Sequence, residues 1–205
     1  MTLGVLGGTF DPIHLGHIAA GEAAQDALSF ESLLLIPSRI PPHRADAVTA
    51  SADDRFAMCR LAAGARPGWS ASRIELDREG PSYTYDTLLE LQEGMDAGSQ
   101  IFFITGADAF AEIASWSRYP AVLDLAHFVV VSRPGITLDS LRERVPSAFC
   151  REPSAKTQVI LVEAPTPDIS STDIRRRARA GHSLSGYVPD SVADYIRDHR
   201  LYLGK

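Results

Sequence analysis

Cysteine and long apolar runs are scarce in this sequence of 205 residues. The two cysteines, Cys59 and Cys150, lie far apart and form no Cys-x-x-Cys pair, so we predict neither a zinc site nor a redox pair there. Two isolated thiols are typical of a reducing compartment. No apolar run approaches the length of a membrane span, and the N-terminus lacks the basic segment and cleavage site of a secretory signal. We therefore expect a cytoplasmic protein without a membrane partner.

Positive charge is also in deficit. The chain has 20 Lys and Arg residues against 26 Asp and Glu residues, which gives a net charge of −6 at pH 7. A non-specific nucleic-acid binder usually carries an excess of positive charge, so we expect no nucleic-acid partner. Local arginines can still bind a small anion against this acidic background. The length fits a single domain over residues 1–205, large enough to bury a substantial core.

Three common ligand-binding motifs are missing near the N-terminus. Gly4, Gly7 and Gly8 do not have the spacing of the GxGxxG dinucleotide fingerprint. The GxxxxGK[ST] pattern of P-loop proteins is absent, and His14 and His17 are not part of an HExxH motif. We therefore expect neither a P-loop enzyme nor a metal ion held by a dedicated set of side chains.

Strand and helix patterns alternate along the chain. Short apolar runs bounded by turn residues predict buried parallel strands at residues 3–6, 33–36, 101–105, 128–132 and 158–162. Helical patterns are found at residues 16–28, 52–63, 84–94, 107–114, 120–126, 138–144, 171–180 and 190–199. This alternation predicts an α/β fold with a doubly wound parallel sheet and closing C-terminal helices. The segment Trp69–Leu76 is expected to add a further strand, at an edge or antiparallel.

One predicted helix has a clear start and an apolar pattern. Ser51, followed by Asp54, is a candidate N-cap for the helix over 52–63. The apolar residues that follow this cap in the helical pattern are Phe56, Met58, Leu61 and Ala62.

The first strand leads directly into a glycine turn that is followed by two histidines. His14 and His17 stand three residues apart at the start of a helical pattern, which places them on one helical face. A helix N-terminus offers free backbone N–H groups and a partial positive charge, both of which favour phosphate. Glycines such as Gly7 and Gly8 allow the backbone to approach that phosphate closely. The pattern predicts a triphosphate site with two imidazoles as hydrogen-bond donors.

Two polar segments follow the second predicted strand. The proline-rich residues 37–44 are expected to form a loop at the carboxyl end of that strand, where ligands bind in open α/β sheets. In the segment 82–88, Ser82 or Thr84 is a candidate N-cap for the next helix, whose free N–H groups suit a carboxylate or phosphate. The alternative for this segment is a helix cap without a binding role.

Three further segments carry candidate contacts to a nucleotide. Gly106 and Asp108 follow a strand and suit a ribose or adenine contact, although Asp108 is also a candidate helix cap. Trp116 is a candidate stacking surface for a flat ring, or else a partly buried core residue. Serines at 170 and 171 open a helix that carries Arg175, which predicts a second anion site.

These segments together resemble one known family. The string GGTFDPIHLGH is similar to the motif of the HxGH nucleotidyltransferase superfamily. It is followed by PPHR, SYTYDTL, GADAF and ISSTDIRRR, the order seen in the bacterial nicotinate-mononucleotide adenylyltransferase family. The resemblance covers essentially the whole chain. The family's loop usually ends in PPHK, whereas this chain has Arg44, so a planar fork replaces a point charge.

The resemblance implies a Rossmann-like nucleotidyltransferase fold, with residues 165–205 as a small helical part that completes the ATP site. It implies that AMP is transferred from ATP to nicotinate mononucleotide, with Mg²⁺ on the ATP phosphates, in NAD biosynthesis. The implied catalytic residues are His14, His17 and Arg175. The implied ATP-binding residues are Gly7, Gly8, Thr9, Phe10, His14, His17, Gly106, Asp108, Arg133, Ile169, Ser170, Ser171 and Arg175. The implied nicotinate mononucleotide-binding residues are Pro42, His43, Arg44, Ser82, Thr84, Tyr85, Trp116 and Ser117.

Other functions remain open at this stage. A pantetheine-phosphate adenylyltransferase-like enzyme shares the first motif, as does a cytidylyltransferase, but SYTYDTL and the Trp116 segment favour a pyridine acceptor. A non-catalytic nucleotide sensor on the same fold is a further alternative; His14, His17 and Arg175 argue against it because a sensor stabilises no leaving group. The protein is expected to be a monomer or a homodimer, with Leu201 and Tyr202 packed on its own core or on a partner.

Overall fold

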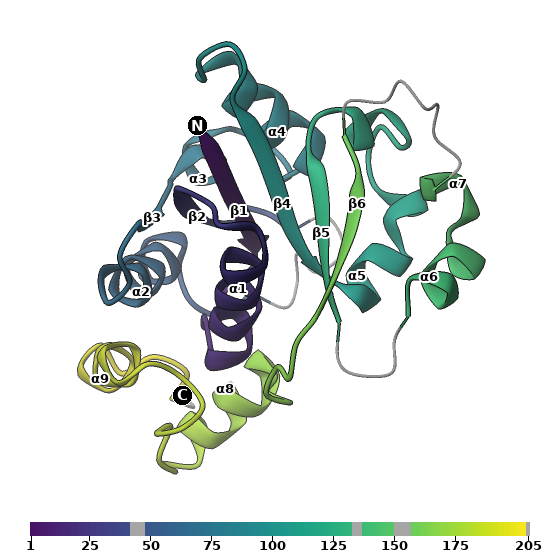
Figure 1. Ribbon diagram of the computed structural model, residues 1–205. Helices are drawn as coiled ribbons and strands as arrows, with labels where there is room; N and C mark the ends of the chain where they lie inside the picture. The colour runs from purple at the N-terminus through teal and green to yellow at the C-terminus, as the bar shows by residue number, and fades with distance from the viewer. Residues whose placement is uncertain (42–47, 133–136, 150–156, 204–205) are drawn as a thin grey trace.

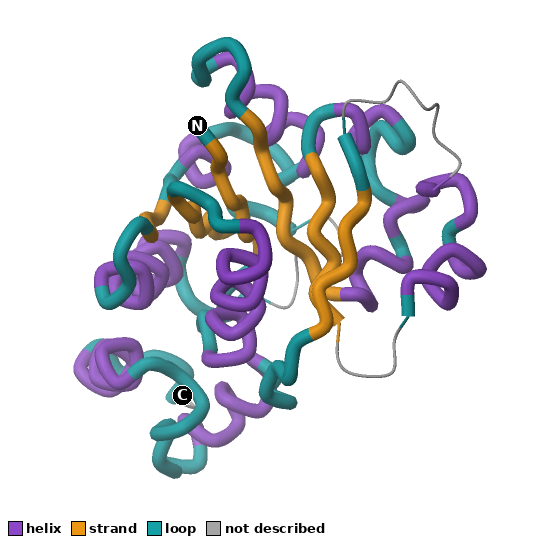
Figure 2. The backbone as a smooth tube through the Cα atoms, in the orientation of Figure 1, coloured by secondary structure: helices purple, strands orange, loops and turns teal. Residues whose placement is uncertain are grey.

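The computed structural model describes residues 1–41, 48–132, 137–149 and 157–203. Its centre is one sheet of six strands in the order β3-β2-β1-β4-β5-β6, and Figure 2 shows these strands as a single layer between helices. All neighbouring strands are parallel. The strands are β1 (Thr2–Gly8), β2 (Ser32–Pro37), β3 (Trp69–Ala71), β4 (Gln100–Gly106), β5 (His127–Ser132) and β6 (Val159–Glu163).

Helices cover both faces of this sheet (Figure 1). One face packs against α1 (Leu15–Leu28) and α2 (Ala52–Gly64), and α8 (Ser171–Arg179) and α9 (Asp190–Asp198) extend the same apolar cluster. The other face packs against α3 (Ile74–Asp77), α4 (Thr84–Glu93), α5 (Ala107–Ala111), α6 (Leu138–Arg144), α7 (Pro146–Phe149) and two 3₁₀ helices, η2 (Ile113–Ser115) and η3 (Ala121–Asp124). The predicted doubly wound parallel fold is confirmed.

Burial on both faces explains why the strands read as continuous apolar runs. Along β5, Val129 and Val131 belong to the apolar cluster under α1, whereas Phe128 and Val130 belong to the cluster under α4 and α5. Successive side chains of a strand point to opposite faces, so a strand covered on both sides requires apolar residues at every position. The run at 128–132 was therefore readable from the sequence.

The strand order places a topological switch point in the middle of the sheet. The chain winds from β1 outward through β2 to β3, then crosses to the other side of β1 to form β4, β5 and β6. Loops at the carboxyl ends of β1 and β4 therefore leave the sheet in opposite directions, and the crevice between them is where open α/β folds bind ligands. In Figure 1, α8 and α9 lie below this end of the sheet, close to α1 and α2.

The expected strand over Trp69–Leu76 is only partly correct. Strand β3 stops at Ala71 and pairs parallel with β2 at the sheet edge. The hydroxyl of Ser72 then accepts the N–H of Ile74 at 3.2 Å, and the chain turns into α3. A local hydroxyl acceptor of this kind competes with strand pairing. The prediction of a possible antiparallel strand, and of strand over residues 74–76, is wrong.

Helix α2 begins as predicted, and Met58 and Ala62 of its apolar pattern are buried. Ser51 caps it, with its hydroxyl accepting the N–H of Asp54 at 3.0 Å. Leu61 of the same pattern is 37% exposed. The stripe that is buried consists of Arg55, Met58, Cys59, Ala62 and Ala63.

The predicted side-chain cap of α4 is wrong. Tyr83 occupies the N-cap position and makes no side-chain cap hydrogen bond. The hydroxyl of Ser82 instead accepts the backbone N–H of Arg39 at 2.8 Å, which ties the start of α4 to the segment after β2. Thr84 is the first helical residue rather than the cap. The other predicted helices agree with the structure within a few residues, except that 107–114 divides into α5 and η2 and that α3 and α7 were not predicted.

Candidate active site

A cleft of about 1540 Å³ opens where β1, β4 and β5 end. This volume exceeds that of an ordinary small-molecule pocket, about 300–1,000 Å³, and is sufficient for two substrates side by side. The strand ends contribute Gly8, Gly106 and Ser132 to its walls. Every predicted ATP-binding residue within the described part of the chain lines this cleft, namely Gly7, Gly8, Thr9, Phe10, His14, His17, Gly106, Asp108, Ile169, Ser170, Ser171 and Arg175.

The predicted acceptor-binding residues are only partly brought to this cleft. Four of them line it: Ser82, Thr84, Trp116 and Ser117. Tyr85 is not among the lining residues; its ring packs in the apolar cluster on the α4 side of the sheet, with the Arg118 guanidinium 5.1 Å from its centroid. The remaining predicted residues, Pro42, His43, Arg44 and Arg133, lie outside the described residues.

His14 and His17 hold each other at the start of α1. His14 is the N-cap, and its Nδ1 accepts the N–H of His17 at 3.3 Å. In return, Nδ1 of His17 accepts the N–H of His14 at 3.2 Å. The two rings stack with centroids 3.6 Å apart and planes 23° apart. Because each Nδ1 acts as an acceptor, the proton of each neutral ring is on Nε2.

Both imidazoles are neutral at physiological pH. Burial lowers the pKa of His14 to about 4. Burial also lowers the pKa of His17 well below its ordinary value, and the neighbouring His14 lowers it further. Each ring therefore has a single N–H donor, at Nε2, and is not a cation that repels its neighbour. A neutral ring with an Nε2–H can donate one hydrogen bond, and the role of the two imidazoles as donors to phosphate stays a prediction.

Two neighbouring residues fix the orientation of this histidine pair. A Cβ on Gly16 would lie 3.1 Å from two atoms of the His14 ring and 3.3 Å from the carbonyl oxygen of Pro167, so a side chain at position 16 would push the ring away. Phe10, buried and in the left-handed backbone region with φ of 49°, presents its ring edge-on to His17 at 5.0 Å. A non-glycine residue in that region stores strain that the surrounding packing must offset.

Helix α8 brings the predicted residues Ser170, Ser171 and Arg175 against the loop before α1. Ser170 caps the helix by accepting the N–H of Asp173 at 3.1 Å. Ser171 donates to the carbonyl oxygen of Pro12 at 3.0 Å, and Arg175 Nη1 donates to the carbonyl oxygen of Asp11 at 2.7 Å. An arginine has five N–H donors, so its guanidinium keeps donors for a phosphate beyond these contacts.

Sequence reasoning missed a buried arginine behind the cleft. Arg55 is 1% exposed, and its Nη1 donates to the carbonyl oxygens of Thr9 at 2.9 Å and Ser38 at 2.6 Å. These carbonyls follow β1 and β2, so one guanidinium joins the carboxyl ends of two adjacent strands. The spacing of Arg55 from Met58 and Cys59 along the helix was the available signal, because i, i+3 and i+4 share one face.

A buried acid at the other end of the cleft was also missed. Glu75 of α3 lines the cleft together with Ser82, is 8% exposed, and accepts a hydrogen bond from the hydroxyl of Thr87 at 2.7 Å. Burial raises the pKa of Glu75. Hydrogen bonds from Thr87 and Ser82 lower it, but their effect is smaller than that of burial. The segment had been predicted as a strand, so no local pattern placed this side chain at a helix turn facing the cleft.

Within the described ranges, no group of three or more His, Cys, Asp or Glu side chains is arranged to hold a metal ion. The same part of the chain contains no helix that is both long and apolar enough to span a bilayer.

Cys59 is buried and free, and burial raises the pKa of its thiol, which fits packing rather than chemistry.

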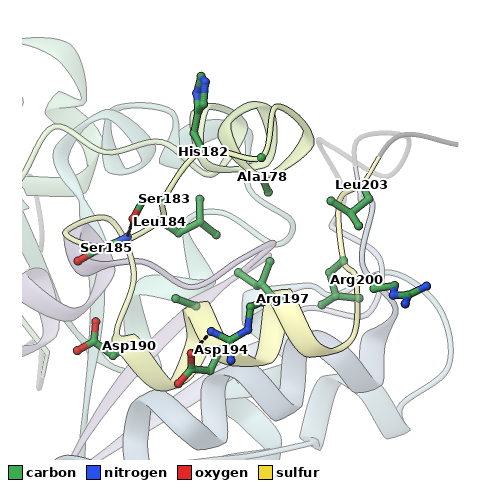
Figure 3. Close-up of a pocket in the computed structure, with 14 residues that line it drawn as sticks. Ala178, His182, Ser183, Leu184, Ser185, Asp190, Asp194, Arg197, Arg200 and Leu203 are labelled. Atoms are coloured by element: carbon green, nitrogen blue, oxygen red, sulfur yellow. Dashed lines mark hydrogen bonds and ion pairs between the residues drawn. The ribbon is translucent and has the colours of Figure 1, made fainter.

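A smaller hollow of about 480 Å³ lies between α8 and α9 (Figure 3). The charged groups around it include Asp194 and Arg197, which form an ion pair at 2.6 Å. None of the predicted site residues that the structure describes lines this hollow. The large cleft at the strand ends is therefore the candidate active site.

Comparison with known proteins agrees with this geometry. A family model described as cytidylyltransferase-like matches residues 5–177. A probable nicotinate-nucleotide adenylyltransferase of Moorella thermoacetica is 39% identical, over 98% of this chain and 91% of the relative. Another, of a Roseiflexus species, is 42% identical over 98% of this chain and 97% of the relative.

Solved structures share the fold. The Plasmodium falciparum nicotinic acid mononucleotide adenylyltransferase complexed with APC aligns with a TM-score of 0.74 at 18% identity, covering 98% of this chain and 96% of that chain. At this identity the match concerns the fold alone. The sequence relatives, in contrast, are similar along nearly their whole length. The chain therefore belongs to the cytidylyltransferase-like family and, within it, to the nicotinate-nucleotide adenylyltransferases.

Proposed function

We propose that this protein transfers the adenylyl group of ATP to nicotinate mononucleotide, giving nicotinate adenine dinucleotide and pyrophosphate. The observation that carries the proposal is the placement of His14, His17 and Arg175 in one cleft with Trp116. Two neutral N–H donors and a guanidinium suit a triphosphate, and an indole suits a flat aromatic acceptor. The names of the sequence relatives support the choice of this acceptor.

The chemistry needs no protein nucleophile. A phosphate oxygen of the acceptor attacks the α-phosphorus of ATP, and the bond from that phosphorus to the pyrophosphate oxygen breaks. Charge accumulates on the departing pyrophosphate, where the Nε2–H groups of His14 and His17 and the guanidinium of Arg175 stabilise it. The rigid mutual hold of the two histidines means that these donors need no reorganisation during the reaction.

The two ends of the cleft suit different parts of the substrates. We assign the triphosphate to Thr9 and to the N-terminus of α8 at Ser170 and Ser171, and the adenosine to Gly8, Gly106 and Asp108. Gly7, Phe10, Arg133 and Ile169 complete the proposed ATP site, and residues 165–205 are proposed as the helical part that closes it.

The acceptor is assigned to the region around α4. The first N–H groups of α4 have no side-chain cap, and a helix N-terminus favours a carboxylate such as that of nicotinate. Ser82, Thr84 and Ser117 line this region and Trp116 stacks on the pyridine, with Pro42, His43, Arg44 and Tyr85 kept as proposed neighbours.

Magnesium enters this proposal as part of the substrate MgATP. The acids that line the cleft include Asp11, Glu75 and Asp108, and the carboxylates of Asp11 and Glu75 already accept hydrogen bonds from the protein. A site without a carboxylate cage fits Mg²⁺, which keeps several of its waters and binds through phosphates. We further propose a cytoplasmic monomer or homodimer.

A pyrophosphate-release assay with a panel of acceptors tests the proposal. Nicotinate mononucleotide, nicotinamide mononucleotide and phosphopantetheine are each supplied with MgATP. We expect the highest kcat/KM with nicotinate mononucleotide. A preference for phosphopantetheine would establish the nearest alternative enzyme, and ATP binding without turnover on any acceptor would establish a nucleotide sensor.

A further inference from the structure

A buried carboxylate lies beneath the ATP end of the cleft and is not used in the proposed chemistry. Asp11 is 2% exposed. Its Oδ1 accepts the N–H of Ala50 at 3.0 Å and the hydroxyl of Tyr202 at 2.9 Å, and its Oδ2 accepts the N–H of Thr49 at 2.7 Å. One side chain therefore joins the loop before α1, the start of α2 and the C-terminal segment.

Arg175 approaches this same residue from α8. Its Nη1 donates to the carbonyl oxygen of Asp11 at 2.7 Å and lies 3.7 Å from Oδ2 of the carboxylate. Arg55 lies on the buried side, and its charge also interacts with that of Asp11. A buried carboxylate is costly unless it is paired and hydrogen-bonded. The three hydrogen bonds to Asp11 satisfy its oxygens, so Arg175 can bond to the backbone carbonyl and keep its remaining donors for the cleft.

Of the hydrogen bonds to Asp11, the one from Tyr202 joins the residues that lie farthest apart in the sequence, 191 positions. This tyrosine comes from the C-terminal segment, is 5% exposed, and packs in the protein's own core with Phe10 and Ile174. Burial and the neighbouring Asp11 raise the pKa of its phenol, so the hydroxyl keeps its proton and donates. Removing that donor would leave Oδ1 of Asp11 with one partner fewer. Arg175, whose Nη1 lies 3.7 Å from Oδ2, is a cation that can then turn toward the carboxylate.

We propose that Tyr202, acting through the Asp11 carboxylate, is a positioning residue that holds Arg175 in the orientation in which it binds the pyrophosphate end of ATP. The inference rests on the proposed function for the role of Arg175. It assigns to the C-terminal segment a part in ordering the phosphate site, although Tyr202 does not line the cleft itself.

The variant Tyr202→Phe tests this directly, because it removes the hydroxyl and keeps the ring. Tyr195→Phe is the matched control: the Tyr195 hydroxyl also donates to a carboxylate, that of Asp54 at 3.0 Å, and does not contact Asp11 or Arg175. Calorimetric titration with inorganic pyrophosphate is expected to show roughly tenfold weaker binding for Tyr202→Phe. A loss of this size corresponds to one hydrogen bond to a charged group. The KM for ATP should rise in parallel, while the KM for the acceptor and all values for Tyr195→Phe stay unchanged.

A double-mutant cycle separates positioning from a structural effect. In an Arg175→Met background, Tyr202→Phe should cause no additional loss of pyrophosphate affinity, because both changes act through one group. Additive losses, unchanged pyrophosphate affinity in Tyr202→Phe, or equal changes in the KM values of both substrates would each overturn the inference. Should Tyr202→Phe fail to fold, Asp11→Asn replaces it with the opposite expectation: pyrophosphate affinity stays close to that of wild type, because Arg175 then has no carboxylate to turn toward. A roughly tenfold loss of pyrophosphate affinity in Asp11→Asn would overturn the inference.

The proposed function and this inference fail in different ways. A wild-type protein that binds pyrophosphate but adenylylates no acceptor contradicts the proposed function, and the inference is then decided by the pyrophosphate titrations alone. A wild-type protein that turns over normally, with Tyr202→Phe indistinguishable from Tyr195→Phe, overturns the inference and leaves the function intact.

Discussion

The imidazoles of His14 and His17 stack 3.6 Å apart, and each Nδ1 accepts the backbone N–H of the other residue. This reciprocal capping box gives the N–H of His14 its acceptor at the start of α1. It also adds a second acceptor for the N–H of His17, which donates to the backbone carbonyl oxygen of His14 at 2.9 Å as well. The same contacts set the tautomer of both rings and leave Nε2–H as the donor. The same two hydrogen bonds therefore cap the helix and orient the donors of the proposed phosphate site.

Replacing His17 with asparagine separates these two roles. An asparagine amide oxygen can accept the His14 N–H in place of Nδ1, but the side chain offers no donor at the position of Nε2. We expect kcat to fall by about 10²–10³, the usual cost of one oxyanion donor, with little change in the free energy of unfolding. His182→Asn, at an exposed histidine beside the smaller hollow, is the control. Turnover of His17→Asn close to that of wild type would refute the donor role.

The stability of the protein should depend on pH through His14. Its pKa is about 4 in the folded state against 6.5 in the unfolded chain, so between these values the unfolded chain binds a proton that the folded protein does not. The free energy of unfolding is therefore complete above pH 6.5 and falls as pH drops toward 4, by about 3 kcal/mol at 1.36 kcal/mol per unit.

Urea denaturation of wild type and His14→Asn at a series of pH values measures this contribution. Asparagine is a good N-cap residue that does not titrate, so the variant should lose less stability across the same pH window. Parallel curves for the two proteins would show that His14 does not titrate in this way.

Trp116 should act on the acceptor rather than on ATP. Its side chain is half-buried in the cleft wall and meets Phe103 edge-on at 6.0 Å. Loss of a stacking partner costs about 0.5–1.5 kcal/mol, so Trp116→Ala should raise the KM for nicotinate mononucleotide a few-fold. Steady-state kinetics with each substrate varied in turn measures both KM values, with Trp116→Phe as a partial rescue. Equal increases for both substrates would indicate a structural role.

Two glycines on helices allow a matched test of packing. A Cβ on Gly21 of α1 would lie 2.4 Å from Cη2 of Trp69, whereas a Cβ on Gly64 of α2 would meet nothing within 4 Å. Gly21→Ala should destabilise the fold by about 1–3 kcal/mol, as over-packing does, while Gly64→Ala should be neutral or stabilise by up to about 1 kcal/mol. Thermal unfolding of both variants measures the difference. Equal melting temperatures would mean that Trp69 of β3 can move away from α1 at no cost in stability.

The features that were predictable from the sequence are those encoded by neighbouring residues. The apolar run of β5 specifies a doubly buried strand without reference to the rest of the chain. The spacing of His14 and His17 predicted that the two rings lie together, but they meet because His14 is the N-cap of α1, with extended backbone, and not through a shared helical face. The hydrogen bond from Tyr202 to Asp11 joins residues separated by 191 positions, and no local pattern encodes such a contact. The expected cap at Ser82 was wrong for the same reason, since its hydroxyl is used by Arg39, 43 positions away.

A competition experiment tests the proposed reaction most directly. Equal amounts of nicotinate mononucleotide and nicotinamide mononucleotide are supplied in one reaction with MgATP, and the two dinucleotide products are quantified by mass spectrometry. Their initial ratio equals the ratio of the two kcat/KM values. We predict that nicotinate adenine dinucleotide predominates, because the uncapped N-terminus of α4 favours a carboxylate over an amide. Predominance of the amide product, or the absence of any dinucleotide, would contradict the proposed function.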